Sequence, residues 1–187
     1  MCGRFSLSML PQQFQQAFAC DPARQINVRS ETAAEKPMFR DSFKKGRCLI
    51  PATGFYEWQK AGTGPSRPFF VALGSGQPFA FAGIWRRNRL ADGTLLDTCA
   101  ILTTGASPLL HPIHHRMPVI LPEANQPLWL DPALKDPEFL QALLTPVPDR
   151  ELTAWEVGRA VNNPRNDGPQ LAEPMAATPA SQQASLI

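Results

Sequence analysis

The chemistry that this sequence can support is clearest at its start, where Cys2 directly follows Met1. If Met1 is removed, the thiol and the α-amine of Cys2 form a 1,2-aminothiol. An aldehyde condenses with the amine to an imine, and the sulfur then closes on the imine carbon to give a thiazolidine that resists hydrolysis. The thiolate is also a strong nucleophile in its own right. The alternative is that Cys2 is a buried structural thiol.

Glu57 is a second candidate, because it stands between Tyr56 and Trp58 in an aromatic stretch. Such surroundings exclude water from a carboxylate and raise its pKa toward neutrality, which suits a general base. The alternative is a glutamate on an edge strand with its side chain in water.

All three histidines lie between His111 and His115, and Arg116 follows them. One interpretation is a metal site, although acidic or thiol partners at a convincing spacing are missing. The other is a single acid/base histidine beside an arginine that binds an anion.

Two further stretches carry polar side chains. Residues 26–32 alternate apolar and polar types, which predicts a strand with Asn27, Arg29 and Glu31 on one face. A merely solvated face is the alternative. Residues 159–168 are dense in amide and guanidinium donors, which indicates either a phosphate-binding loop or an ordinary Asn/Gly turn.

The elements that must position these residues are mostly strands. Short strands separated by turn residues are expected at 48–51, 54–58, 68–73, 78–85, 97–103, 117–121 and 152–157. Helices are expected at 33–45, interrupted or started at Pro37, and at 122–130 and 136–144. Leu10, Phe14 and Phe18 have the spacing of a helical face after a strand at 5–7. Regular crossover helices are missing. The pattern therefore favours an α+β fold with a mostly antiparallel, barrel-like β core and flanking short helices.

The composition is that of a globular protein, with 187 residues of which 43% are hydrophobic and 18% are charged. The net charge of +2 is too small to argue nucleic-acid binding by itself. The four cysteines are widely separated and form no CxxC pair, which argues against a zinc knuckle or a disulfide scaffold. Neither a leader peptide nor a membrane-spanning apolar run occurs, so a soluble, intracellular protein is expected.

Six motifs, in their order along the chain, resemble those of the SRAP family, the SOS response-associated peptidase fold. They are MCGRF at 1–5, NVRSET at 27–32, GRCLIP at 46–51, GFYEW at 54–58, IHHRMP at 113–118 and VNNPRN at 161–166. Each motif alone is weak, but six in register make the match specific. The resemblance predicts a single SRAP-like domain over 1–172, and the Ala-, Pro-, Ser- and Gln-rich tail at 173–187 is expected to be disordered.

The resemblance implies a sensor and shield for abasic sites in single-stranded DNA. In that family the initiator methionine is removed, and the N-terminal cysteine forms a thiazolidine with the aldehyde of the ring-opened deoxyribose. Carried over by motif, Cys2 is the cross-linking nucleophile and Asn27 contacts its amine or the opened sugar. Glu57 would orient or deprotonate the amine, and His114 would protonate the ring oxygen of the sugar.

The resemblance also implies how DNA is held. Arg4, Arg29 and Arg116 are expected to contact backbone phosphates, with Thr103 as an additional contact. The implied partner is single-stranded DNA with abasic sites, and no metal, cofactor or membrane is implied. A monomer in the cytoplasm, associated with the nucleoid when bound to DNA, is expected.

The sequence departs from the family at two places. In the family, a segment with an Asn-(Val/Ile)-Ala-Pro motif and a Trp-Gly-Leu-(Ile/Val)-Pro-like motif follows the first helix. Here Arg24 and Gln25 run straight into Ile26, and the intact flanking motifs favour omitted residues over a true internal deletion. In addition, His115 stands where the family often has an acidic residue.

Two other functions stay open. A thiol peptidase would use Cys2 with His114 and Glu57, either on peptides or only to release Met1, but the sequence indicates no oxyanion hole or substrate pocket. A non-covalent single-stranded DNA binding module would use the arginines and aromatic residues, with Cys2 as a structural thiol.

Overall fold

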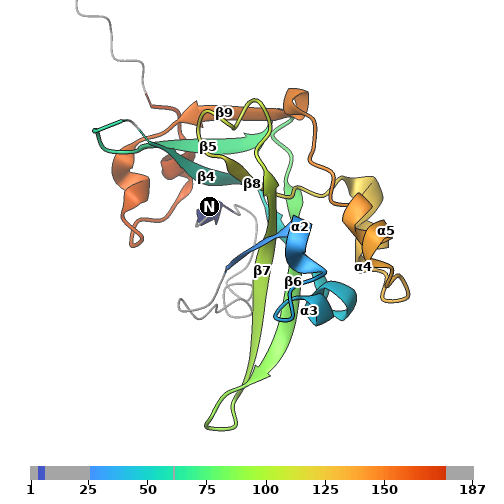
Figure 1. The fold of residues 1–187 in the computed structure, drawn as a ribbon. Coiled ribbons are helices and arrows are strands. Elements are labelled where there is room, and N and C mark those ends of the chain that lie inside the picture. The colour runs from blue at the N-terminus through green and yellow to red at the C-terminus, as the bar shows by residue number, and fades with distance from the viewer. Residues whose placement is uncertain (1–3, 7–25, 61, 176–187) are drawn as a thin grey trace, which may run out of the picture.

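The computed structural model describes residues 4–6, 26–60 and 62–175, and its strands form two sheets (Figure 1). The strands are β1 (Arg4–Ser6), β2 (Asn27–Arg29), β3 (Arg47–Ala52), β4 (Gly54–Gln59), β5 (Arg67–Leu73), β6 (Phe79–Arg89), β7 (Leu95–Gly105), β8 (Arg116–Pro118) and β9 (Leu152–Glu156). The first sheet has the order β1-β4-β5-β9. The second has the order β2-β7-β6-β3, with β8 also paired to β7.

Among the described residues, four short helices cover one face of the second sheet. They are α2 (Ser30–Ala33), α3 (Arg40–Lys45), α4 (Gln126–Leu130) and α5 (Pro137–Ala142). Turns of 3-10 helix lie at Glu123–Asn125, Asp149–Glu151, Arg159–Asn162 and Pro169–Ala172. In the part of the chain that the structure describes, no helix is long and apolar enough to cross a membrane.

The chain changes sheets between β3 and β4, which only Thr53 separates. β3 pairs with β6 through Ala52 and Phe79, whereas β4 pairs with β5 through Phe55 and Val71. Because consecutive strands join different sheets, the described strands form no closed barrel. The predicted α+β fold with mostly antiparallel strands is confirmed, and β2 with β7 is a parallel pair.

Apolar side chains fill the space between the sheets and on both outer faces. Between the sheets, the core includes Phe55 and Val71 of the first sheet and Phe81 and Ile101 of the second. A second cluster joins the other face of the second sheet to the helices and includes fully buried Trp129. A third cluster lies on the outer face of the first sheet. Each described sheet is therefore packed on both of its faces.

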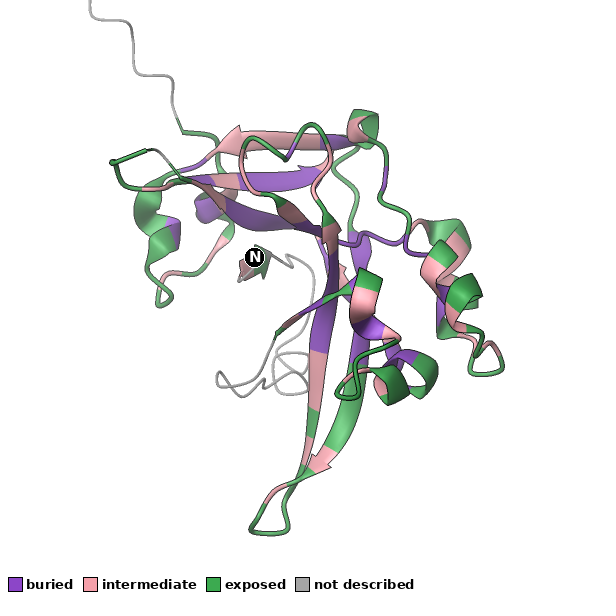
Figure 2. Cartoon of the chain, viewed as in Figure 1, coloured by how far each residue is buried: buried purple, intermediate pink, exposed green. Residues whose placement is uncertain are grey.

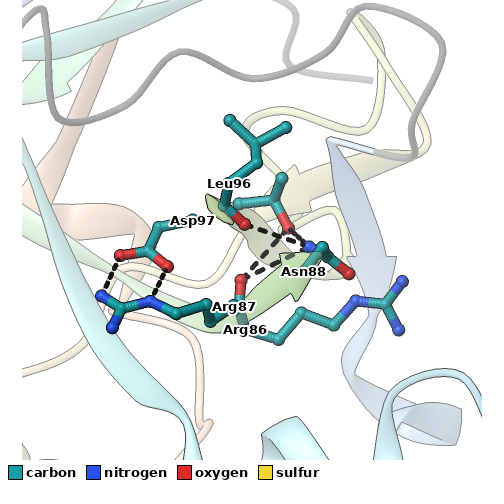
Figure 3. A network of polar contacts seen from close by, with 6 residues as sticks. Arg86, Arg87, Asn88, Leu96 and Asp97 are labelled. Carbon is teal, nitrogen blue, oxygen red and sulfur yellow. Dashed lines mark hydrogen bonds and ion pairs between the residues drawn. The ribbon is translucent and has the colours of Figure 1, made fainter. Parts of the chain in front are cut away.

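The β6–β7 hairpin is longer than the sequence predicted and extends beyond the helices (Figure 1), and its far end is exposed (Figure 2). The guanidinium of Arg87 donates two hydrogen bonds of 2.7 Å to the carboxylate of Asp97 on the other strand. The side-chain amide of Asn88 donates to Oγ1 of Thr98 at 2.9 Å (Figure 3). These cross-strand bonds extend the pairing past Trp85.

The prediction of one strand over 26–32 is wrong after Arg29, because α2 begins at Ser30. Ser30 and Ala33 are the buried residues of α2, and their spacing of three is that of a helix. Asn27 and Arg29 therefore lie on a strand, but Glu31 does not share a strand face with them. The predicted helix at 33–45 is also shorter and is regular only from Arg40.

Several predicted features lie outside the described residues. They include Cys2, the helix through Leu10, Phe14 and Phe18, and the junction before Ile26. Of the predicted tail, residues up to Met175 are described. The amide of Met175 donates to the carbonyl of Glu156 at 2.8 Å, which places this part of the chain against the end of β9.

A buried arginine joins α3 and α4 to the second sheet. Arg47 is 8% exposed, and burial lowers the pKa of its guanidinium. Its guanidinium donates to the backbone carbonyls of Trp129 (2.6 Å), Lys44 (2.7 Å), Leu134 (2.9 Å), Phe43 (3.2 Å) and Asp131 (2.5 Å). Carbonyls at helix C-termini lack partners within the helix, so this one side chain satisfies the ends of two helices.

Replacing Arg47 by methionine is expected to lower the free energy of unfolding by about 3 kcal/mol, because several buried carbonyls lose their donor at once. Urea denaturation measures the change. The matched control is Arg40→Met on the exposed side of α3, for which a change within about 0.5 kcal/mol is expected. If Arg47→Met and Arg40→Met lower the free energy of unfolding by similar amounts, the buried hydrogen bonds of Arg47 have no stabilising effect of their own.

Candidate functional site

Glu57 is a buried carboxylate in the middle of β4, with 2% of its surface exposed. Alternate residues of a strand share a face, so its side chain points to the same side as Phe55, into the space between the sheets. The flanking aromatic residues Tyr56 and Trp58 belong to the cluster on the opposite face. Burial between the sheets raises the pKa of Glu57 to about 7. This carboxylate can therefore accept and return a proton near neutral pH.

His114 is the histidine that the fold brings to Glu57. Its Nδ1 lies 3.9 Å from Oε2 of Glu57. The same nitrogen lies 3.1 Å from the backbone N of Arg116 and 2.9 Å from the backbone O of Arg116. Nδ1 thus has a donor to accept from and a carbonyl to donate to, so the turn can hold the ring in either protonation state. Burial lowers the pKa of His114.

The other two histidines lie at the surface. The ring of His115 is exposed and stacks on that of His114, with the ring centres 4.4 Å apart. The charge of His114 lowers the pKa of His115. His111 is exposed at the start of the same turn region. Across residues 4–6, 26–60 and 62–175, no group of three His, Cys, Asp or Glu side chains is arranged to hold a metal ion.

Arg116 is anchored inside the protein by both of its terminal nitrogens. Nη1 and Nη2 donate to the two carboxylate oxygens of Glu31 at 2.7 and 2.9 Å. Nη2 also donates to Oγ1 of buried Thr103 at 3.1 Å and to its carbonyl. The hydrogen bonds from Arg116 lower the pKa of Glu31. Three elements, α2, β7 and β8, therefore meet at this guanidinium.

Asn27 and Arg29 lie on the same face of β2, away from buried Val28 between them. Pairing with β7 sets Asn27 beside Ile101 and Arg29 beside Thr103. Asn27 is half-buried, whereas Arg29 is exposed. The positive charge of Arg29 reaches the neighbouring turn, where it contributes to lowering the pKa of His115. Arg29 is the predicted phosphate contact with the most accessible charge.

Arg4 lies on β1, directly opposite Tyr56 of β4. Its guanidinium donates to the carbonyls of Asn166 at 2.8 Å, Asn163 at 3.2 Å and Val161. The loop at 159–168 was predicted to supply donors to an anion or to be a turn. In this structure its carbonyls accept hydrogen bonds from Arg4, which fastens the first strand to the end of the domain.

The site therefore gathers most of the predicted residues, and it adds one that the sequence did not single out for the site. The side chains of Glu57 and His114 approach to 3.9 Å, and Asn27, Arg29, Thr103 and Arg116 lie on neighbouring strands of the second sheet. The added residue is Glu31, whose partner Arg116 is 85 positions away, so no local pattern could reveal the pairing.

The part of the chain that the structure describes holds two thiols. Cys48 and Cys99 are both partly buried. Burial raises the pKa of Cys48 to about 12, so its thiolate is scarce at neutral pH.

The SOS response associated peptidase (SRAP) family model matches residues 20–164. The chain is 42% identical over 150 residues to the abasic site processing protein YoqW of Bacillus subtilis (strain 168) and 35% identical over 156 residues to YedK of Escherichia coli (strain K12). Both alignments cover 80% of this chain and 67% of the relative. The abasic site processing protein HMCES of Pongo abelii is 31% identical over 177 residues, with 80% of this chain and 49% of the relative covered.

Solved structures have the same fold. A protein from Bacteroides thetaiotaomicron superposes with a TM-score of 0.73 and 31% identity, covering 80% of this chain and 65% of that chain. A protein from Bordetella bronchiseptica superposes with a TM-score of 0.64 and 30% identity, covering 82% of this chain and 74% of that chain. The chain thus spans about two thirds to three quarters of these bacterial relatives and about half of HMCES.

Proposed function

Because the chain belongs to the SOS response-associated peptidase (SRAP) family, we propose that it captures abasic sites in single-stranded DNA through a thiazolidine formed by Cys2. Relatives from bacteria and vertebrates bear the name abasic site processing protein. The observation that carries the proposal is the approach of partly buried His114 to buried Glu57, 3.9 Å apart, beside the strand that begins two residues after Cys2.

Chain connectivity supports a place for Cys2 near this pair. Arg4 pairs with Tyr56, the immediate neighbour of Glu57. Two residues span at most about 7 Å, so a reaction of Cys2 beside β4 would be within the reach of the chain that precedes Arg4. A carboxylate whose pKa is about 7 is suited to accept a proton from an aminothiol within hydrogen-bonding reach.

The proposed reaction begins with removal of Met1. Glu57 accepts a proton from the ammonium group of Cys2, and His114 donates a proton to the sugar oxygen, which favours the open aldehyde. The amine attacks C1′ of the aldehyde, and loss of one water gives the imine. Sγ of Cys2 then adds to the imine carbon, and the thiol proton ends on the ring nitrogen. Aldehyde and aminothiol thus become thiazolidine and water.

The surrounding cations and amides would hold the DNA strand. Arg29 is exposed on β2 beside the site and is suited to contact a phosphate. Asn27, on the same strand face, is suited to contact the opened sugar or the amine of Cys2. Arg4, Thr103 and Arg116 would fix the walls of the site through their internal hydrogen bonds, and they would add phosphate contacts from these positions.

Intact-mass spectrometry tests the proposal. The purified protein is incubated with a single-stranded oligonucleotide that carries one abasic site, and in parallel with one that carries a tetrahydrofuran analogue, which has no aldehyde. We expect loss of Met1 and, with the abasic site only, a heat-resistant mass increase equal to the oligonucleotide minus one water. Binding of both oligonucleotides without any covalent mass would instead identify a non-covalent binder. Retention of Met1 would mean that the aminothiol was never formed.

A further inference from the structure

The ion pair between Glu31 and Arg116 joins two segments that carry candidate site residues. Glu31 lies in the first turn of α2, two residues after Arg29. Arg116 begins β8, two residues after His114. The pair is bidentate, which is the geometry with the greatest directional specificity for a guanidinium and a carboxylate.

The two partners differ in burial. The side chain of Arg116 is 11% exposed, whereas that of Glu31 is 47% exposed. Nε of Arg116 is buried and makes no hydrogen bond to any residue that the structure describes. The carboxylate of Glu31 therefore supplies the charge compensation for an enclosed cation, which an ordinary surface pair does not do.

The backbone of Arg116 in turn holds His114, because its N and O atoms lie 3.1 and 2.9 Å from Nδ1 of the ring. On the other side, Thr103 connects the guanidinium to β2. Its Oγ1 accepts from Arg116 and donates to the carbonyl of Val28 at 3.3 Å. Anchoring the side chain of Arg116 thus restrains both the histidine turn and the strand that carries Asn27.

We propose that Glu31 is a positioning residue for the abasic-site reaction: it clamps Arg116, and the clamp keeps the His114 ring against Glu57 and β2 against β7. This inference rests on the proposed function. It also assigns different tasks to the two neighbouring arginines. Arg116 links elements of the site, and Arg29 is the exposed cation that meets the DNA.

The charges around His114 give the clamp a measurable signature. Charged and titratable groups from three parts of the chain face the rings of His114 and His115. They are Glu57 on β4 and Lys60 just after this strand, His115 and Arg116 in the turn of His114, and Arg29 on β2. Loss of the Glu31 carboxylate would leave the charge of Arg116 uncompensated beside this group. An uncompensated cation disfavours a second positive charge, so the pKa of His114 would fall further.

The test compares Glu31→Gln with Glu35→Gln. Glu35 is an exposed glutamate four residues later whose side chain makes no ion pair with the described cations, so it is a matched control. For Glu31→Gln we expect a rate of adduct formation about tenfold lower at saturating DNA, with DNA affinity little changed. NMR titration of the His114 ring in the DNA-free protein should show a lower pKa. Glu35→Gln should change neither, and Glu31→Asp, which keeps the carboxylate, should retain most of the histidine pKa.

Two outcomes would overturn the inference. One is an unchanged rate together with an unchanged His114 titration in Glu31→Gln. The other is tighter DNA binding with a salt dependence steeper by about one released ion, which would show that Glu31 competes with phosphate for Arg116. The NMR measurement needs no DNA. If the wild-type protein forms no adduct at all, the proposed function fails, while the titration still decides whether Glu31 positions the histidine turn.

Discussion

Replacement of Cys2 by alanine is expected to abolish the heat-stable DNA adduct completely while single-stranded DNA binding persists. The α-amine remains after Met1 is removed, so an imine with the abasic aldehyde can still form. Without the sulfur the ring cannot close, and the imine hydrolyses or is lost on heating. Denaturing gels and intact-mass spectrometry after heating measure the adduct, and binding to an aldehyde-free analogue measures affinity.

Borohydride separates the role of the thiol from that of the amine. It reduces an imine to a stable amine but leaves a closed thiazolidine unchanged, so we expect trapping in Cys2→Ala. The matched thiol control is Cys48→Ala, because burial raises the pKa of Cys48 to about 12 and keeps that thiol unreactive. A heat-stable adduct in Cys2→Ala, or its loss in Cys48→Ala, would contradict the assignment of the nucleophile. Unchanged binding without any adduct in the wild-type protein would favour the non-covalent alternative.

The strands of this fold could be predicted from the sequence, but not their division into two sheets. β3 and β4 are each visible as an apolar run bounded by turn residues. Their separation depends on which distant strand each one meets, as when Ala52 pairs with Phe79. The alternation of apolar and polar residues within a segment carries no information about such pairings. A barrel-like core and two packed sheets therefore produce the same sequence pattern.

The candidate site shows the same division between local and distant signals. Glu57 and the histidine cluster stand out by their neighbours in the sequence, and the fold brings one histidine of that cluster, His114, to 3.9 Å from Glu57. The alternation at the start of its segment predicts a strand for Glu31, whereas the buried positions Ser30 and Ala33 follow helical spacing. Its partner Arg116 is 85 residues away in the sequence. The carbonyl partners of Arg4 are more than 150 residues from Arg4. Only the folded chain reveals such pairs.

Glu57→Gln is the second change for which a large effect is expected, a loss of about 10²-fold in the rate of adduct formation at neutral pH. Glutamine keeps the size of the side chain but cannot accept a proton. With a pKa of about 7, the carboxylate is ionised in a substantial share of molecules at pH 7, so the wild-type protein has its base available. Single-turnover kinetics on the abasic oligonucleotide measure the rate, with Glu35→Gln as the control.

The pH dependence gives this variant a specific signature. The reaction needs ionised Glu57 and protonated His114, and the pKa of His114 lies below its ordinary value of 6.5. The wild-type rate should therefore follow a bell whose maximum lies on the acid side of pH 7. Division of the wild-type rate by the Glu57→Gln rate cancels the titration of His114 and of the amine. This ratio should rise through pH 7 and level off above it, and a ratio independent of pH would contradict a proton-accepting role.

The same substitution is expected to stabilise the protein at alkaline pH. The folded pKa of about 7 lies above the ordinary value of 4.5, so the folded state binds more protons than the unfolded state between these values. Stability therefore falls as pH rises through this window, and the cost is complete above pH 7. Glu57→Gln removes that cost, which at 1.36 kcal/mol per unit is up to about 3 kcal/mol at pH 8 and close to zero at pH 4. Urea denaturation at both pH values measures the difference. If Glu57→Gln is more stable at pH 8 but forms the adduct more slowly, the buried carboxylate is retained for its chemistry. If the substitution lowers stability equally at both pH values, Glu57 has a structural role in the core.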